Sequence, residues 1–284
     1  VNLAGYCLGG TLALTTLAYM TAKKDKRANS ATFFTTMLDF SEPGELGIFL
    51  DEGAVAGLEK KMQERGFLEG SEMAGTFNML RANDLIWSFV VNNYLMGKDP
   101  FPFDLLYWNS DSTRMPAAMH SFYLRNMYLG NLLREPGGLE LGGVKIDLTK
   151  VKTPCYFIST VEDHIAPWKS TYMGARLPSG PTKFVLGGSG HIAGIVNPPV
   201  ANKYGYWTND ATDGNLPENP EDFLAGATQN AGSWWTHWNE WVTSLSGGSA
   251  KVKARKPEDG ALKVIEDAPG SYVKFRLDAQ KKEK

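Results

Sequence analysis

The chain has 284 residues, 43% of them hydrophobic and 21% charged, with a formal net charge of -2 at pH 7. This length allows a large buried core, and the near-neutral charge gives no basic field that would attract nucleic acid. No run approaches the ~18 consecutive apolar residues of a membrane-spanning helix, and no secretory signal is visible. Two cysteines, Cys7 and Cys155, argue against a disulfide framework and favour the cytoplasm.

The first forty residues predict a strand, a tight turn, a helix and a second strand. Residues 1–6 form an apolar run, and residues 11–24 are rich in Leu and Ala and end in two lysines, as in a buried helix. Residues 31–40, ATFFTTMLDF, are rich in Phe and Thr and predict the second strand. Such a unit implies a parallel sheet.

Later segments predict that the sheet resumes after a long insertion. A strand is expected at 154–160 (PCYFIST), a helix at 168–175 and a strand at 182–186 (TKFVL). Trp234, Trp238 and Trp241 share one helical face, which predicts a terminal helix docked on the core. We divide the chain into a first core segment (1–42), a mostly helical cap insertion (43–150), a second core segment (151–245) and a carboxyl-terminal tail (246–284).

Residues 5–9, Gly-Tyr-Cys-Leu-Gly, have the form G-x-C-x-G, which is the nucleophile-elbow pattern with cysteine in place of serine. A side chain at Gly5 or Gly9 is expected to clash with neighbouring backbone in this sharp turn. The start of a helix favours a thiolate at Cys7 and makes the backbone N–H of Leu8 an oxyanion donor. The alternative is a chance pattern with Cys7 as a buried core thiol.

The order of the other polar residues favours the catalytic interpretation. In α/β-hydrolases the nucleophile is followed by an acid and then a histidine, each after a late strand. Asp163 follows the strand at 154–160, and His191 lies in the glycine-rich loop after the strand at 182–186. We therefore expect His191 to be the base for Cys7 and Asp163 to orient it.

Three nearby residues compete with or accompany this assignment. His164 is the competing base, but adjacent residues point in different directions, so we assign it a supporting role beside the triad. Glu162 is the competing acid. Cys155 falls inside a predicted strand and is expected to be an inert core residue.

The chemistry of cysteine favours acyl transfer over ester hydrolysis. A cysteine nucleophile forms a thioester, so an acyl group taken from another thioester stays activated for transfer to an alcohol. A cap that excludes water would favour that transfer, although some cysteine hydrolases of this fold cleave lactones.

Several long segments resemble polyhydroxyalkanoate synthases. They are GYCLGGTLA around Cys7, TMLDF at 36–40, RANDLIWSFVVNNYLMG at 81–97, FDLLYWNSDSTRMP at 103–116, EDHIAPW at 162–168, SGHIAGIVNPP at 189–199, GSWWTHWNEW at 232–241 and, more weakly, APGSYVKFR at 268–276. The resemblance covers nearly the whole chain, and SGHIAGIVNPP is similar to the class I enzymes, which have one subunit type and use short-chain substrates.

By this resemblance the fold is an α/β-hydrolase fold with a helical cap, and the catalytic residues are Cys7, His191 and Asp163, the last in preference to Glu162. In the family the acid either completes the triad or activates the 3-hydroxyl of the incoming monomer. The substrates implied are (R)-3-hydroxyacyl-CoA and a growing polyester. A homodimer, a cap that opens and residence on cytoplasmic polyester granules are implied as well.

The resemblance implies no metal and no cofactor, because CoA is the leaving group, and no motif indicates which residues bind it. The chain begins without Met, directly on the elbow, and lacks the earlier loop that supplies a second oxyanion donor. We therefore expect an amino-terminal part to be missing. Two alternatives remain: a cysteine-dependent hydrolase of esters or lactones, and a non-catalytic granule-binding protein.

Overall fold

The computed structural model describes residues 1–100, 112–212, 214–247 and 259–275. The chain forms two compact units, Val1–Leu245 and Ser246–Lys284. The described part of the second unit contains a short 3-10 turn at Tyr272–Lys274. Residues 103–111 of the segment that resembles the synthases, and residues 248–258 and 276–284 of the expected tail, lie outside the described residues.

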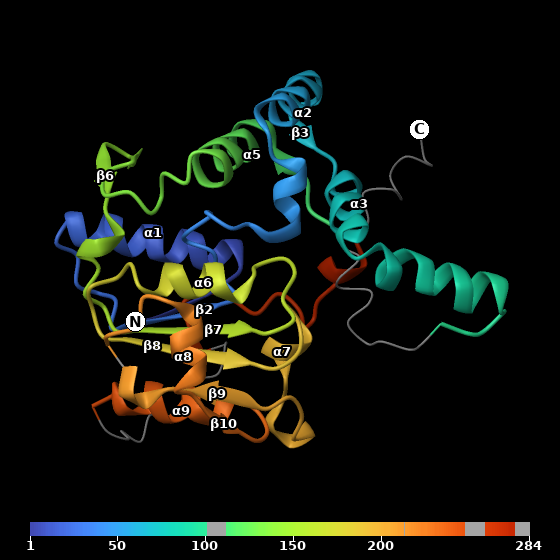
Figure 1. The fold of residues 1–284 in the computed structure, drawn as a ribbon. Helices are drawn as coiled ribbons and strands as arrows, with labels where there is room; N and C mark the ends of the chain where they lie inside the picture. The colour runs from blue at the N-terminus through green and yellow to red at the C-terminus, as the bar shows by residue number, and fades with distance from the viewer. Residues whose placement is uncertain (101–111, 213, 248–258, 276–284) are drawn as a thin grey trace. The chain divides into compact units, whose positions relative to one another are not determined.

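A six-stranded sheet runs through the first unit (Figure 1). Its strands are β1 (Asn2–Tyr6), β2 (Ser30–Phe34), β7 (Cys155–Thr160), β8 (Thr182–Gly187), β9 (Tyr206–Thr208) and β10 (Thr228–Asn230), in that spatial order. The first four are parallel, and β9 and β10 are antiparallel to their neighbours. The predicted parallel sheet is confirmed.

Helices cover both faces of this sheet. One face carries α1 (Leu8–Ala22), α6 (Trp168–Ala175) and α8 (Pro220–Ala225), and the other carries α9 (Trp235–Ser244) with the short α7 (Ala193–Val196). Because successive side chains of a strand point to opposite faces, Phe33 packs in the core beneath α1 while Phe34 packs against Trp234. The predicted docking of a tryptophan-rich terminal helix on the core is confirmed.

The second predicted strand is shorter than expected. The sequence predicted a strand through residue 40, but β2 ends at Phe34 because Thr35 has a φ of 43°, which turns the chain out of the sheet. Residues 35–40 are nevertheless buried. The Phe and Thr content of this segment therefore reflects a buried loop, which the Thr11 hydroxyl holds by donating to the Met37 carbonyl at 2.7 Å.

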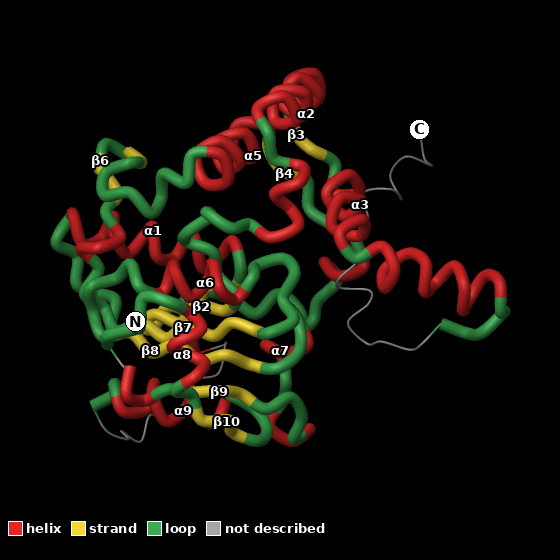
Figure 2. Tube along the Cα trace, viewed as in Figure 1, coloured by secondary structure: helices red, strands yellow, loops and turns green. Residues whose placement is uncertain are grey.

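The segment between β2 and β7 is mostly helical among its described residues (Figure 2). It contains α2 (Glu52–Arg65), α3 (Gly70–Leu80), π-helical turns at Asn83–Trp87, Val90–Leu95 and Leu124–Leu129, α5 (Ala117–Tyr123), the paired strands β3 (Phe67–Leu68) and β4 (Met115–Pro116), the hairpin of β5 (Leu139–Leu141) and β6 (Val144–Ile146), and 3-10 turns at Gly44–Phe49 and Leu148–Lys150. We call residues 43–150 the cap. In Figure 1, α2 and α5 lie beyond α1, away from the sheet.

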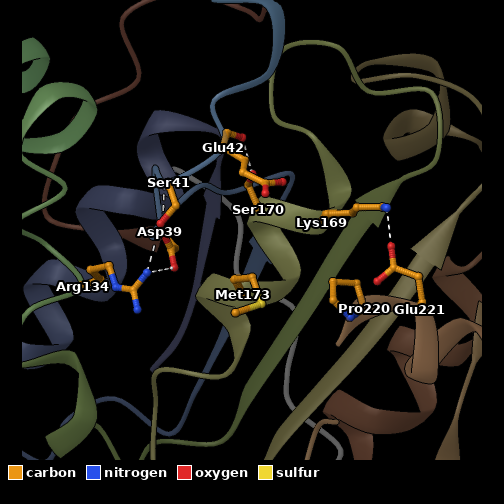
Figure 3. Close-up of a pocket in the computed structure, with 9 residues that line it drawn as sticks. All are labelled: Asp39, Ser41, Glu42, Arg134, Lys169, Ser170, Met173, Pro220 and Glu221. Atoms are coloured by element: carbon orange, nitrogen blue, oxygen red, sulfur yellow. Dashed lines mark hydrogen bonds and ion pairs between the residues drawn. The ribbon is translucent and has the colours of Figure 1, made fainter. Parts of the chain in front are cut away.

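A buried carboxylate ties the loop after β2 to the end of the cap (Figure 3). Asp39 is 3% exposed and accepts hydrogen bonds from the Asn131 amide at 2.9 Å and the Arg134 guanidinium at 2.7 Å. Asp39 and Arg134 border a pocket of about 270 Å³ beside α6, where Lys169 pairs with Glu221. Because its two cations are paired with carboxylates, this pocket offers no unpaired cation for an anionic ligand.

Candidate active site

Cys7 occupies a strained turn between β1 and α1. Its φ of 52° and ψ of -121° are unusual for a residue with a side chain, and its N–H donates to the Phe34 carbonyl at 2.8 Å. Its carbonyl accepts from the N–H groups of Gly10 and Thr11, which starts the helix. Leu8 is the first residue of α1, where an N–H has no acceptor within the helix and is free to face a ligand.

The glycines that this turn requires differ from the prediction. A Cβ at Gly5 would lie 2.5 Å from the Gly10 Cα, as expected for the elbow. A Cβ at Gly9, however, would meet nothing within 4 Å, because this residue faces open space. The second close approach is at Gly10, where a Cβ would lie 1.8 Å from the Thr36 hydroxyl. The expected clash at Gly9 is therefore wrong, and Gly5 and Gly10 are the glycines that packing requires.

The structure brings Asp163 and His191 into contact from two successive loops. His191 Nδ1 donates to Asp163 Oδ2 at 2.7 Å, and Asp163 Oδ1 accepts from the N–H groups of Ile165 and Ala166, each at 2.9 Å. The Asp163 side chain is fully buried. Backbone N–H groups thus hold Oδ1 of Asp163, while Oδ2 orients the imidazole. This leaves Nε2 of His191 to face other groups.

Cys7 lines the same pocket as His191, and the pKa of the His191 imidazole reflects both Asp163 and Cys7. Burial lowers this pKa, but the hydrogen bond to Asp163 and the interactions with the Asp163 and Cys7 charges raise it more, to about 9. A free cysteine thiol has a pKa of about 8.5, so the imidazole is a strong enough base to take a thiol proton.

Two features that the sequence analysis missed hold the His191 loop in place. The Tyr6 hydroxyl donates to the His191 carbonyl, and the two rings meet edge to face at 5.4 Å. On the other side of the loop, Trp234 donates to the Gly194 carbonyl at 3.0 Å and Trp235 to the Ile195 carbonyl at 3.1 Å. Tyr6 is an unspecified position of the elbow pattern, and the tryptophans are forty residues away in sequence, so no motif indicated these contacts.

The competing residues are placed differently. His164 is half-buried, and burial is the main cause that lowers the pKa of its imidazole. The Asp163 carboxylate is hydrogen-bonded to the ring of His191, not to that of His164. Glu162 is exposed. Cys155 is fully buried in β7, and burial raises the pKa of its thiol to about 12.

A pocket of about 730 Å³ opens above Cys7. The core contributes the polar groups of Cys7 and His191, and the cap contributes a mostly apolar wall. That wall includes Leu46, Phe49, Leu50, Val55, Leu58, Leu68, Met73, Phe77, Met115 and Leu124. An apolar pocket with a few convergent polar groups is typical of a small-molecule site.

A family model described as alpha/beta hydrolase fold matches residues 1–198. The chain belongs to this family. The fold class predicted from the sequence is therefore confirmed.

Several curated relatives of this chain are named as poly(3-hydroxyalkanoate) polymerases or their PhaC subunits. The chain is 54% identical over 276 residues to the poly(3-hydroxyalkanoate) polymerase subunit PhaC of Rhizobium meliloti, and the match covers 97% of this chain and 44% of that protein. It is 51% identical to the poly(3-hydroxyalkanoate) polymerase of Methylorubrum extorquens and 44% identical to the PhaC subunit of Cupriavidus necator, each over 97% of this chain. The chain spans 45% and 47% of these two proteins, less than half in every case.

Among solved structures, a monoacylglycerol lipase of Paleococcus ferrophilus aligns with a TM-score of 0.40 and 14% identity, covering 86% of this chain and 68% of that one. Within the described ranges, none of the helices has the length and apolar character needed to cross a membrane. The same residues contain no cluster of three or more His, Cys, Asp or Glu side chains suited to a metal ion.

Proposed function

We propose that this chain carries the catalytic centre of a polyhydroxyalkanoate synthase, which polymerises (R)-3-hydroxyacyl groups from CoA. The observation that carries the proposal is that the elbow cysteine lines a mostly apolar pocket together with His191, whose imidazole is hydrogen-bonded to Asp163. The names of the relatives supply the substrate class.

The first half of the reaction is a thioester exchange at Cys7. His191 takes the thiol proton while the sulfur attacks the acyl carbonyl, and the N–H of Leu8 stabilises the developing oxyanion. The bond between the acyl carbon and the CoA sulfur then breaks. CoA leaves with the proton from His191, and the acyl group remains on Cys7 as a thioester.

In the second half, the hydroxyl oxygen of another hydroxyacyl-CoA attacks the thioester on Cys7. An ester bond forms, the bond to the Cys7 sulfur breaks, and the hydroxyl proton passes to His191, which returns it to the sulfur. The lengthened chain, now attached to CoA, returns to Cys7 by the same exchange. Asp163 keeps the His191 ring oriented for both proton transfers.

The pocket suits a chain better than a single monomer. At about 30 Å³ for each water-sized group, the six non-hydrogen atoms of a hydroxybutyryl group occupy about 200 Å³. The pocket of about 730 Å³ therefore has room for more than one such unit. Its apolar wall disfavours water, which supports transfer to a hydroxyl over hydrolysis.

The proposal extends to a homodimer at the surface of cytoplasmic polyester granules, with no cofactor beyond the CoA of the substrate. Sedimentation of the purified protein and fractionation of granules from cells that express it test these two points. A monomer absent from granules would contradict both.

The decisive assay incubates the chain with (R)-3-hydroxybutyryl-CoA and analyses both CoA and the acyl product. Because the relatives are about twice as long, the chain is assayed alone and joined to the amino-terminal part of the Rhizobium meliloti relative. We expect CoA release with insoluble polyester, both lost in Cys7→Ala. Free 3-hydroxybutyrate instead of polyester would indicate a hydrolase, and no CoA release from either form, with an unreactive Cys7, would indicate a binding protein.

A further inference from the structure

The pocket above Cys7 contains a second imidazole that the reaction described above does not use. His120 lies in α5 and is 9% exposed. Tyr123 and Leu124, three and four residues later, line the same pocket, so this face of α5 and of the turn after it forms part of the pocket wall. His120 therefore belongs to the cap side of the pocket, whereas Cys7 and His191 belong to the core side.

One nitrogen of the His120 ring has no hydrogen-bond partner in the part of the chain that the structure describes. Its Nδ1 atom is buried and has no partner among the described residues. Buried polar atoms in folded proteins are almost always paired, so an unpaired one in a pocket wall is unusual and calls for an explanation.

The charged side chains on the cap side of the pocket are already paired. Lys61 and Glu72, which also line the pocket, form an ion pair at 2.6 Å. On the neighbouring positions of α5 and the turn after it, Ser121 and Arg125 bind Glu59. Among the described residues, Nδ1 of His120 therefore remains unpaired in a mostly apolar wall.

We propose that His120 hydrogen-bonds an oxygen of the bound acyl group or chain, and so makes the pocket select oxygen-bearing acyl groups over plain hydrocarbon ones. The inference rests on the proposed function, because it assigns the group that His120 meets to the acyl substrate. Cys7 and His120 line the same pocket, so an acyl group held on Cys7 would share that space with the His120 ring.

The state of the ring fits both oxygens that such a substrate offers. Burial lowers the pKa of His120, so the ring is neutral at pH 7 and carries one N–H donor and one acceptor. The donor suits an ester carbonyl, and the acceptor suits a hydroxyl. A plain hydrocarbon chain would bury the ring without pairing it, which is unfavourable.

The test compares acyl-CoA substrates that differ only in oxygen content. Single-turnover CoA release is measured with (R)-3-hydroxybutyryl-CoA, with butyryl-CoA, and with the CoA thioester of the linear hydroxybutyrate dimer. We expect the protein to favour at least one oxygen-bearing substrate over butyryl-CoA by about tenfold or more in kcat/KM, as for one hydrogen bond. A preference for the monomer identifies the hydroxyl as the partner, and a preference for the dimer alone identifies the ester oxygen.

His120→Phe is expected to reduce this preference to about twofold or less, because it removes the hydrogen bond to the oxygen-bearing substrate and also the unpaired ring that disfavours butyryl-CoA. His120→Gln, which keeps a donor and an acceptor, is expected to retain most of the preference. If His120→Phe does not fold, as judged by circular dichroism, His120→Met replaces it as the apolar variant.

An unchanged preference in the apolar variant would overturn the inference, and so would an equal loss of rate with all three substrates, which would indicate a packing role. Failure of the proposed function gives a different result, namely that wild-type protein releases CoA from none of the substrates, or releases it with free acid and no polyester.

Discussion

Replacing Asp163 with Asn tests how much of the reaction depends on the carboxylate behind His191. The Asn oxygen can still accept from the N–H groups of Ile165 and Ala166, but its NH₂ group would face His191 Nδ1 and favour the wrong tautomer. The change therefore removes one charge and one hydrogen bond while keeping the size of the side chain.

The size of the effect follows from the pKa of His191. Its rise from 6.5 to about 9 corresponds to about 3 kcal/mol of stabilisation of the imidazolium, supplied by Asp163 and Cys7 against the opposing effect of burial. Losing most of this lowers the acylation rate by about 10²-fold, and the wrong tautomer lowers it further, towards about 10⁴-fold. Single-turnover CoA release from (R)-3-hydroxybutyryl-CoA measures the rate.

His164→Ala is the matched control, because His164 does not hold the Asp163–His191 hydrogen bond and should leave the rate within about threefold of wild type. A normal rate in Asp163→Asn, together with a large loss in His164→Ala, would refute the assignment of His191 as the base.

The same pKa predicts how stability depends on pH. Since the folded-state pKa of His191 is raised, its protonation stabilises the fold fully below about pH 6.5, and this contribution is lost as the pH rises through about 9. The difference in Tm between wild type and Asp163→Asn should therefore be larger at pH 6 than at about pH 9.5. A difference that grows with pH would contradict this reasoning.

Three further predictions concern the thiols, the elbow and the buried carboxylate. Iodoacetamide should modify Cys7 and spare Cys155, which is fully buried with a pKa raised to about 12; peptide mass spectrometry reads the site, and earlier modification of Cys155 would contradict the assignment. Gly10→Ala should lower the free energy of unfolding by about 2 kcal/mol or more through overpacking, while Gly9→Ala should change it by less than about 1 kcal/mol; equal effects in urea titrations would refute the packing argument. Asp39→Ala should destabilise the protein by about 2–4 kcal/mol at pH 7, because it leaves buried donors and a cation unpaired. Burial raises the pKa of Asp39, but hydrogen bonds and the Arg134 charge together lower it, so this loss of stability should shrink only as the pH falls below about 4. Thermal melts at several pH values measure the effect.

Local patterns in the sequence predicted much of the sheet and its order along the chain. Residues 1–6, 154–160 and 182–186 combine apolar and β-branched composition with clear turn signals, and each contains a strand within a residue or two of the expected bounds. The contact between Asp163 and His191 could be anticipated because parallel strands end at the same edge of the sheet.

What composition could not predict depends on long-range packing. Burial of residues 35–40 gave them a strand-like composition although Thr35 turns the chain away from the sheet. The elbow pattern specifies a glycine at position 9, but the position where a side chain would clash is Gly10. The clash is with Thr36, which lies beside Gly10 only in the folded chain. His120 lies in a helix whose sequence carries no catalytic motif. Its unpaired Nδ1 atom can be recognised only once the positions of the surrounding described side chains are known.

The attachment of Trp234 and Trp235 to the loop after His191 gives the active site an optical reporter. The two indoles stack at 4.1 Å, and Trp234 is fully buried, so their emission depends on whether the carbonyls of Gly194 and Ile195 stay in place. Any event that displaces the His191 loop, whether heat, denaturant or acylation of Cys7, also changes the surroundings of these indoles. Tryptophan fluorescence is therefore expected to report movement of the His191 loop without any label.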